Sequence, residues 1–152
     1  MTRITTGAAA LVAAALALPG CSKSPPPIVA AGGVVLLNGQ PLPNAQVQFI
    51  PMIQGFGAEY IAVGVTDEKG RFTLTCNGQP GACACENRVT VTDAPPPEKT
   101  RGLSDSAQTE MTRYYAGLKN RPIPPDYGSV AKTSIVIKVT PGQSDYTLEL
   151  KR

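Results

Sequence analysis

Residues 34–51 read VVLLNGQPLPNAQVQFIP, and this stretch decides the fold class. The apolar run 34–37 ends at Asn38 and Gly39, a dipeptide that favours a tight turn between antiparallel strands. Apolar and glutamine side chains then alternate through 45–49, the pattern of a strand with one buried and one solvated face. Pro51 ends that strand. The stretch therefore predicts two short β-strands connected by turns.

The same alternation recurs along the rest of the chain. It predicts five further strands, at 60–66, 71–76, 87–92, 134–140 and 146–150. Residues 67–70 (DEKG) predict a turn in which Gly70 takes a positive φ, so strands 60–66 and 71–76 are expected to form a β-hairpin. Seven short strands without crossover helices indicate an all-β fold, a seven-stranded antiparallel sandwich of two sheets.

A long connection, 93–133, separates the fifth and sixth predicted strands. It begins with the proline-rich segment 94–99 and continues into a predicted helix at 106–118. The apolar positions of this helix are spaced for one face: Ala107, Met111, Tyr114, Tyr115 and Leu118. Asp105 with Gln108 is expected to cap it. Two interpretations remain open, a helix that plugs one end of the sandwich and a helix that binds a partner.

The N-terminus has the layout of a bacterial export signal. Arg3 precedes an apolar stretch that begins at Gly7 and ends in Leu18, Pro19, Gly20 and Cys21, a pattern typical of a lipobox. We expect residues 1–20 to be a lipoprotein signal peptide, Cys21 to carry acyl chains that anchor the chain to a membrane, and 21–32 to be a proline-rich tether. The alternative is an ordinary secretory signal whose cleavage leaves a free thiol. The expected location is the cell envelope, on the periplasmic or outer surface of a membrane.

Composition narrows the function classes. The chain has 14 Lys and Arg, 11 Asp and Glu, and no histidine. Without the residues 1–20 it has 13 basic and 11 acidic side chains, and no basic cluster, so we expect no nucleic-acid partner. Absence of histidine removes every catalytic triad built on imidazole and the commonest metal ligand. We therefore expect no catalytic residues, no cofactor and no metal site, and a protein that is not an enzyme.

Several segments together resemble a known domain. Residues 35–51 match a "dGkPlpgA" turn and a "V.F.P" strand, 66–72 a "TD..G.F" hairpin, and 88–91 a "Y.V.V" strand. Residues 123–150 are similar to the C-terminal half of small bacterial lipoproteins built on the same unit. The family is the carboxypeptidase regulatory-like, or transthyretin-like, domain. The resemblance covers 33–150 and implies, for 33–152, a Greek-key β-sandwich of the transthyretin (prealbumin) type without a common catalytic site. The chain departs from the family pattern at 81–87 and at Asp126.

Three cysteines, Cys76, Cys83 and Cys85, lie beyond the expected anchor at Cys21. An exported chain meets an oxidising compartment, so we expect a disulfide from Cys76 to Cys83, or to Cys85. The shorter loop favours Cys83 slightly. Three thiolates on a soft metal such as Cu(I), or buried free thiols, remain the alternatives.

These features lead to one expected function and one alternative. We expect a membrane-anchored envelope lipoprotein whose sandwich is a non-catalytic structural or protein-interaction module. The alternative is a carbohydrate- or peptide-binding module that uses the 94–133 loop and the rings of Tyr114, Tyr115 and Tyr127. The expected partners are the membrane, through Cys21, and an unidentified envelope protein or glycan. Solvent exposure of the three rings distinguishes the two functions, because a structural protein would bury them.

Overall fold

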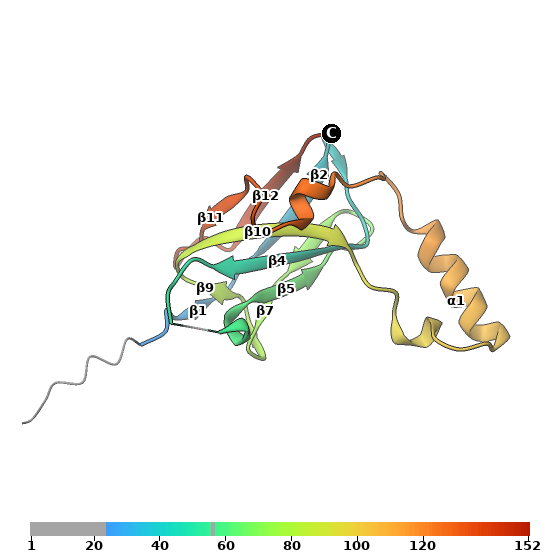
Figure 1. The fold of residues 1–152 in the computed structure, drawn as a ribbon, viewed down its shortest axis with the longest axis horizontal. Coiled ribbons are helices and arrows are strands. Elements are labelled where there is room, and N and C mark those ends of the chain that lie inside the picture. Colours follow the sequence, from blue (N-terminus) through green and yellow to red (C-terminus); the bar gives the residue numbers. More distant parts are fainter. Residues whose placement is uncertain (1–23, 56) are drawn as a thin grey trace, which may run out of the picture.

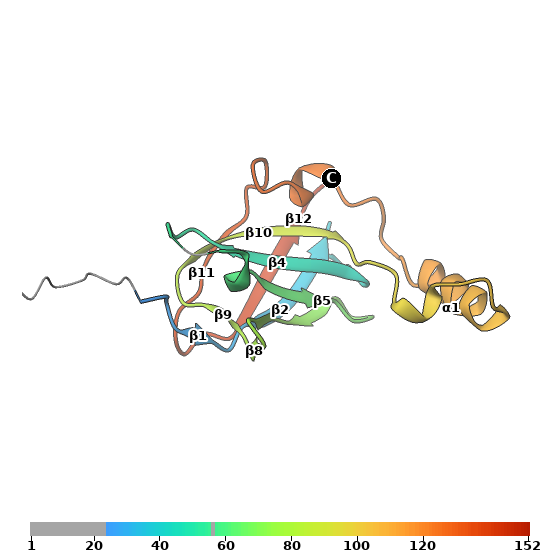
Figure 2. The same ribbon diagram turned by 60° about the horizontal axis from the view of Figure 1, so that its bottom comes forward.

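The computed structural model describes residues 24–55 and 57–152; Cys21 and the expected signal peptide lie outside them. The described chain is mostly β-structure with one α-helix, and its two larger sheets enclose a common core (Figure 1, Figure 2). This agrees with the expected all-β class at the level of a sandwich.

The strands form three sheets among the described residues. The six-stranded sheet has the order β11 (Val136–Lys138), β10 (Glu86–Asp93), β4 (Ala45–Pro51), β5 (Ala62–Val65), β7 (Thr75–Cys76), β8 (Gln79–Pro80). The four-stranded sheet has the order β12 (Asp145–Leu150), β2 (Gly32–Leu37), β3 (Gln40–Pro41), with β6 (Arg71–Thr73) also paired to β2. The third sheet contains only β1 (Ile28–Val29) and β9 (Ala82–Cys83). The expected boundary at 33 is therefore too late, because β1 and the buried Ala31 already belong to the fold. The helices are α1 (Asp105–Ala116) and the 3₁₀ turns η1 (Ala58–Tyr60), η2 (Glu98–Thr100) and η3 (Pro125–Gly128).

The core lies between the two larger sheets and is centred on Phe49. Burial alternates along β4 as its sequence predicts, with Val47 and Phe49 fully buried. The Phe49 ring lies 6.3 Å from the ring of Phe72 in β6 and 6.3 Å from the ring of Tyr146 in β12. The four-stranded sheet contributes Phe72 and Tyr146, so this aromatic cluster joins the two layers.

The turn predicted at Asn38 and Gly39 is confirmed. Their φ angles are 52° and 75°, and the turn pairs Leu37 of β2 with Gln40 of β3. Positive φ at both central positions is the geometry that matches the twist of a two-residue hairpin, and asparagine followed by glycine adopts it readily.

The predicted hairpin between 60–66 and 71–76 is wrong in its second half. Residues 71–76 split: β6 pairs with β2 of the four-stranded sheet, and only β7 pairs with β5, through Val63 and Thr75. The chain passes from one sheet to the other at Leu74, whose N–H donates to the carbonyl of Ala31 at 3.0 Å. The continuous segment 71–76 thus contributes one short strand to each of the two larger sheets.

The expectation that every strand pair is antiparallel is also wrong at one place. β12 pairs with β2 in parallel over their whole length, from Asp145 opposite Gly32 to Leu150 opposite Leu37. The segment after β11 crosses from the six-stranded to the four-stranded sheet, so β12 does not fold back on β11 as a hairpin. A crossing between layers allows parallel neighbours without a crossover helix.

The α1 helix agrees with the predicted position but not with the predicted cap. It runs Asp105–Ala116, and its N-cap is Ser104, whose Oγ accepts from the N–H of Ala107 at 3.2 Å. Asp105 is the first helical residue, so the capping by Asp105 and Gln108 is wrong. The helix projects beyond the end of the sandwich and packs on η2, with only Ala107 buried, so it does not plug that end (Figure 1).

Candidate functional site

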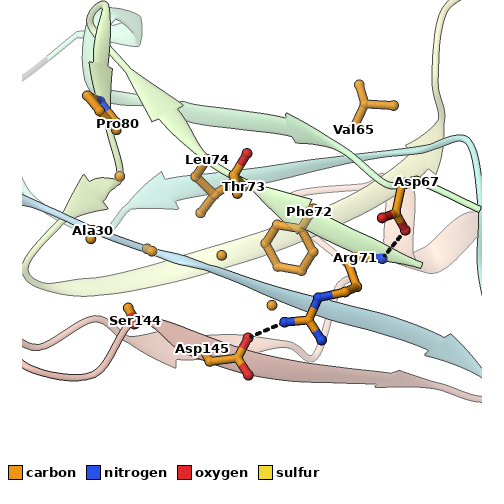
Figure 3. A pocket seen from close by; sticks show the side chains of 14 residues that line it. Ala30, Val65, Asp67, Arg71, Phe72, Thr73, Leu74, Pro80, Ser144 and Asp145 are labelled. Atoms are coloured by element: carbon orange, nitrogen blue, oxygen red, sulfur yellow. Dashed lines mark hydrogen bonds and ion pairs between the residues drawn. The ribbon is translucent and has the colours of Figure 1, made fainter. Parts of the chain in front are cut away.

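A groove of about 700 Å³ lies along β2 and β6 of the four-stranded sheet, and Val65 of β5 and Pro80 of β8, from the six-stranded sheet, also line it (Figure 3). Its floor is backbone, because the middle strand β2 has Gly32 and Gly33 there. Arg71 of β6 and Asp145 of β12 stand on its two sides and form an ion pair of 3.6 Å across it. Both side chains are largely exposed, so water screens this pair and it contributes little to stability.

The carboxylate of Asp67, which also lines this groove, holds the neighbouring turn. Its Oδ1 accepts from the N–H of Lys69 at 2.8 Å and from the N–H of Arg71 at 2.9 Å. The structure therefore agrees with a turn at 67–70, and Gly70 has the expected positive φ of 74°. Nothing in this groove converges on a point where a substrate atom would react: its charged groups serve the turn and the ion pair.

The second feature is a cluster of thiols near one end of the sandwich. Cys76 and Cys83 are fully buried, and both sulfurs lie within hydrogen-bonding distance of the carbonyl oxygen of Tyr60, at 3.3 and 3.9 Å. Cys85 is half-buried and donates instead to the carbonyl of Glu86. All three are free thiols in the structure. The geometry brings Cys76 together with Cys83, and the disulfide between them stays a prediction.

Burial governs the acidity of all three thiols. The pKa of Cys83 is raised to about 12, chiefly by burial and to a smaller extent by the neighbouring Cys76. Burial also raises the pKa of Cys76, although the hydrogen bond from Cys83 partly offsets it. The pKa of Cys85 is raised by burial too, against hydrogen bonds from Met52 and Asn87 that lower it. The thiols are therefore protonated at neutral pH and are weak nucleophiles there. The part of the chain that the structure describes holds no group of three His, Cys, Asp or Glu side chains placed to bind a metal.

The three tyrosines proposed to contact a ligand are not gathered at one place. Tyr114 and Tyr115 lie on α1 with their rings 5.6 Å apart, whereas Tyr127 lies in η3 against the sandwich. Tyr114 is half-buried and donates its hydroxyl to the carbonyl of Ala94, and Tyr127 accepts from the N–H of Lys151 at 3.0 Å. Only Tyr115 exposes most of its surface, 63%. Two of the rings therefore serve the fold.

We call residues 94–121, with α1 at their centre, the α1 lobe. Glu110 of α1 forms two ion pairs within this lobe, with Lys99 of η2 at 2.6 Å and with Arg113 at 2.8 Å. The hydrogen bond from Lys99 is the main reason that the pKa of Glu110 is lowered. Leu103, at the loop before α1, is 94% exposed.

Arg121 attaches the α1 lobe to the sandwich, and sequence reasoning missed it. Its guanidinium pairs with Asp93 at the end of β10 and donates to the carbonyls of Pro43 and Asn44, at 2.8 and 3.1 Å. The side chain of Asn44 in turn donates to the carbonyl of Gly117 at 3.0 Å. No local pattern signals this role, because the partners lie 28 to 78 residues away along the chain.

The expected lipidation site, Cys21, lies outside the described residues. Within 24–55 and 57–152, no helix has the length and apolar character needed to cross a membrane.

Comparison with known proteins returned no match, whether the chain was compared with models of protein families, with curated proteins or with solved structures. The resemblance to carboxypeptidase regulatory-like domains therefore rests on the sequence motifs alone.

Proposed function

We propose that this chain is an envelope lipoprotein, anchored through Cys21, whose sandwich is a non-catalytic interaction module that presents the α1 lobe to another envelope protein. One observation carries the proposal: the first described residues and β1 lie at one end of the long axis, and the α1 lobe lies at the other (Figure 1, Figure 2). A chain tethered before β1 would hold the α1 lobe as far from its anchor as the domain allows.

The α1 lobe carries the surface suited to a protein partner. Leu103 and Tyr115 are its exposed large apolar side chains, at 94% and 63%, and the same lobe carries charged residues of both signs. Apolar anchors within a polar rim are typical of protein interfaces, and tyrosine is enriched in their energetic centres. The lobe also contributes little to the core, since Ala107 is the buried residue of α1. Its surface is therefore free to serve binding.

Binding of a glycan or peptide is the second candidate. The exposed ring of Tyr115, in edge contact with that of Tyr114, supports it, because an exposed aromatic face can stack on a sugar. The hydroxyls of Tyr114 and Tyr127 are committed to the backbone, which leaves one ring instead of three. This candidate therefore ranks second.

We also propose that the sandwich has the seven-stranded Greek-key organisation of transthyretin-like domains. Each of the seven expected segments contains a strand, and the "TD..G.F" motif lies at the turn between β5 and β6, where Asp67 holds the backbone. A solved structure of the protein would test this organisation directly.

Anchoring is tested first, with the full chain in a bacterial host that processes lipoproteins. Mass spectrometry of the membrane fraction should find an N-terminus at Cys21 with acyl chains, and Cys21→Ser should release the protein. A wild-type chain that is soluble and unmodified would contradict the anchor.

The binding surface is tested by placing a photo-crosslinking amino acid at Tyr115 in living cells. Val136 in β11 is the matched control, because it is 46% exposed but belongs to the sandwich. We expect one discrete protein adduct from position 115, lost when Leu103→Ala is added, and none from 136. Equal adducts from both positions would refute the lobe as the surface. Retention on purified cell-wall glycan that Tyr115→Ala abolishes would favour the second candidate.

A further inference from the structure

β1 is the strand nearest the expected anchor, and few backbone hydrogen bonds between strands hold it. Among residues 24–55 and 57–152, β1 pairs only with β9, and the pairing is two residues long, Ile28 opposite Cys83 and Val29 opposite Ala82. One further bond, from the N–H of Ala84 to the carbonyl of Pro27 at 2.9 Å, extends it. An isolated two-stranded ladder is marginal in water. Packing of Ile28 and Val29 against the core adds to this ladder, and a covalent link would hold this end more firmly against a pull from the tether.

The backbones of β1 and of the segment before β9 lie very close to each other at Gly81. Gly81, just before β9, has φ of 122°, and a Cβ there would lie 1.9 Å from the carbonyl oxygen of Val29. The backbone of β1 thus rests directly on the segment that leads into β9. Behind that segment lies β7, which belongs to the six-stranded sheet and packs against β9.

The buried thiols sit at this junction. Cys76 belongs to β7 and Cys83 to β9, so the contact between their side chains joins the six-stranded sheet to the two-stranded one. Both sulfurs lie within 4 Å of one atom, the carbonyl oxygen of Tyr60, at 3.3 and 3.9 Å. Two buried cysteines on contacting strands, with both sulfurs at one carbonyl oxygen, are the natural candidates for a disulfide.

We propose that Cys76 and Cys83 are a redox site whose disulfide locks β1 and β9, the anchor end of the domain, to the six-stranded sheet, and that Cys85 remains the free thiol. The mechanical meaning of this lock rests on the proposed anchoring through Cys21; the choice of Cys76 and Cys83 does not.

Cys85 is excluded from the bond by its surroundings. The side chain of Asn87 donates to the carbonyls of Cys83 and Cys85, at 3.1 and 2.9 Å, and holds this stretch of backbone. The sulfur of Cys85 donates to the carbonyl of Glu86 at 3.4 Å, whereas the other two sulfurs lie at the carbonyl of Tyr60. It is also the only one of the three that is not fully buried.

The reaction is thiol–disulfide exchange with a disulfide oxidant, either an exported oxidase or a small-molecule disulfide. One cysteine thiolate attacks the oxidant, forming a mixed disulfide and releasing one oxidant thiolate. The second cysteine then attacks the protein sulfur of that mixed disulfide and releases the second oxidant thiolate. Two S–H bonds are lost and one S–S bond forms, two protons pass to solvent or to the released thiolates, and the oxidant gains the two electrons. Because the folded thiols are buried and have raised pKa values, exchange should occur during folding and be slow afterwards.

The experiment uses the purified full chain, denatured and refolded in oxidised and reduced glutathione, or in reductant alone. Free thiols are alkylated and mapped by mass spectrometry without reduction. In the wild type we expect a disulfide between Cys76 and Cys83, and an alkylated Cys85. In Cys85→Ser we expect the same disulfide and no alkylated thiol at position 85. Hydrogen exchange of peptides covering β1 and β9 should be at least about tenfold slower in the oxidised form, whereas β10 should be unchanged.

The outcomes separate this proposal from the proposed function. A bond that includes Cys85, thiols that all stay free, or exchange that is equal in both forms at β1 and β9 would overturn it. The comparison of the oxidised and reduced wild-type protein needs no variant. Cys83→Ala is the second test, and it should remove the difference in hydrogen exchange between the oxidising and reducing conditions. A bond that forms in vitro, with only free thiols in the protein taken from cells, supports the site and contradicts export.

Discussion

Replacing Phe49 by alanine tests the central claim that one aromatic cluster holds the two sheets together. Phe49 has no solvent exposure and contacts the rings of Phe72 and Tyr146 at 6.3 Å each. Truncating a buried phenylalanine costs about 3–5 kcal/mol, and each lost aromatic pair contributes about 0.5–1.5 kcal/mol beyond burial. Since both pairs are lost and both neighbouring rings belong to the sheet that faces Phe49, we expect a loss near the upper end, about 4–5 kcal/mol.

Urea denaturation of the chain without its first 21 residues, followed by circular dichroism, measures this loss. Gln46→Ala is the matched control, because Gln46 lies on the same strand with its side chain on the outer face, and it should change stability by no more than about 0.5 kcal/mol. If Phe49→Ala leaves too little folded protein, Phe49→Leu should give a smaller but measurable loss of about 1–2 kcal/mol. Equal losses from Gln46→Ala and Phe49→Ala would refute the assignment of faces on β4.

Three further predictions follow from single positions. Gly33→Ala should destabilise the domain by more than about 3 kcal/mol, because its Cβ would lie 1.8 Å from the carbonyl oxygen of Tyr146. Gly39→Ala is the control and should cost about 1 kcal/mol, because the space around Gly39 is open. Similar denaturation midpoints for the two variants would contradict this prediction. Arg121→Lys should loosen the attachment of the α1 lobe, because one ammonium group cannot make all the contacts of the planar guanidinium. Protease cleavage within 94–121 should therefore become faster, whereas the stability of the sandwich to unfolding should change little. The pKa of Cys83 is about 12 in the folded protein and lower in the unfolded chain, so the reduced protein should lose stability as the pH rises above about 9. Cys83→Ala should make this loss of stability with pH smaller. A variant with the same dependence of stability on pH as the wild type would argue against a buried thiol at position 83.

The sequence alone was enough for the features that depend on near neighbours. Alternation along 45–49 specifies which face of β4 is buried, and Asn38 with Gly39 specifies a hairpin turn, because each depends on a few adjacent residues. The α1 helix follows from its own spacing in the same way, although its cap lay one residue earlier than expected.

Tertiary structure decided the features in which distant segments compete for one space. β5 is the clearest case: Val63 and Val65 face outward, 37% and 51% exposed, while Ala62 and Gly64 face the core. Hydrophobicity would place the valines inside. The chain crossing between the sheets passes so close that a Cβ at Gly64 would lie 2.3 Å from the carbonyl oxygen of Thr73. Only very small residues fit there, and this steric limit overrides the preference of the valines.

The candidate sites divide along the same line. The position of the cysteines in the chain left Cys83 and Cys85 open as partners for a predicted disulfide with Cys76. The structure adds that the sulfurs of Cys76 and Cys83 both lie at the carbonyl of Tyr60, whereas that of Cys85 lies at the carbonyl of Glu86. The parallel pairing of β12 with β2 and the role of Arg121 were likewise beyond sequence reasoning. Local patterns act through backbone preferences over a few residues, whereas these contacts exist only because the closed sandwich brings residues far apart in the chain to the same place.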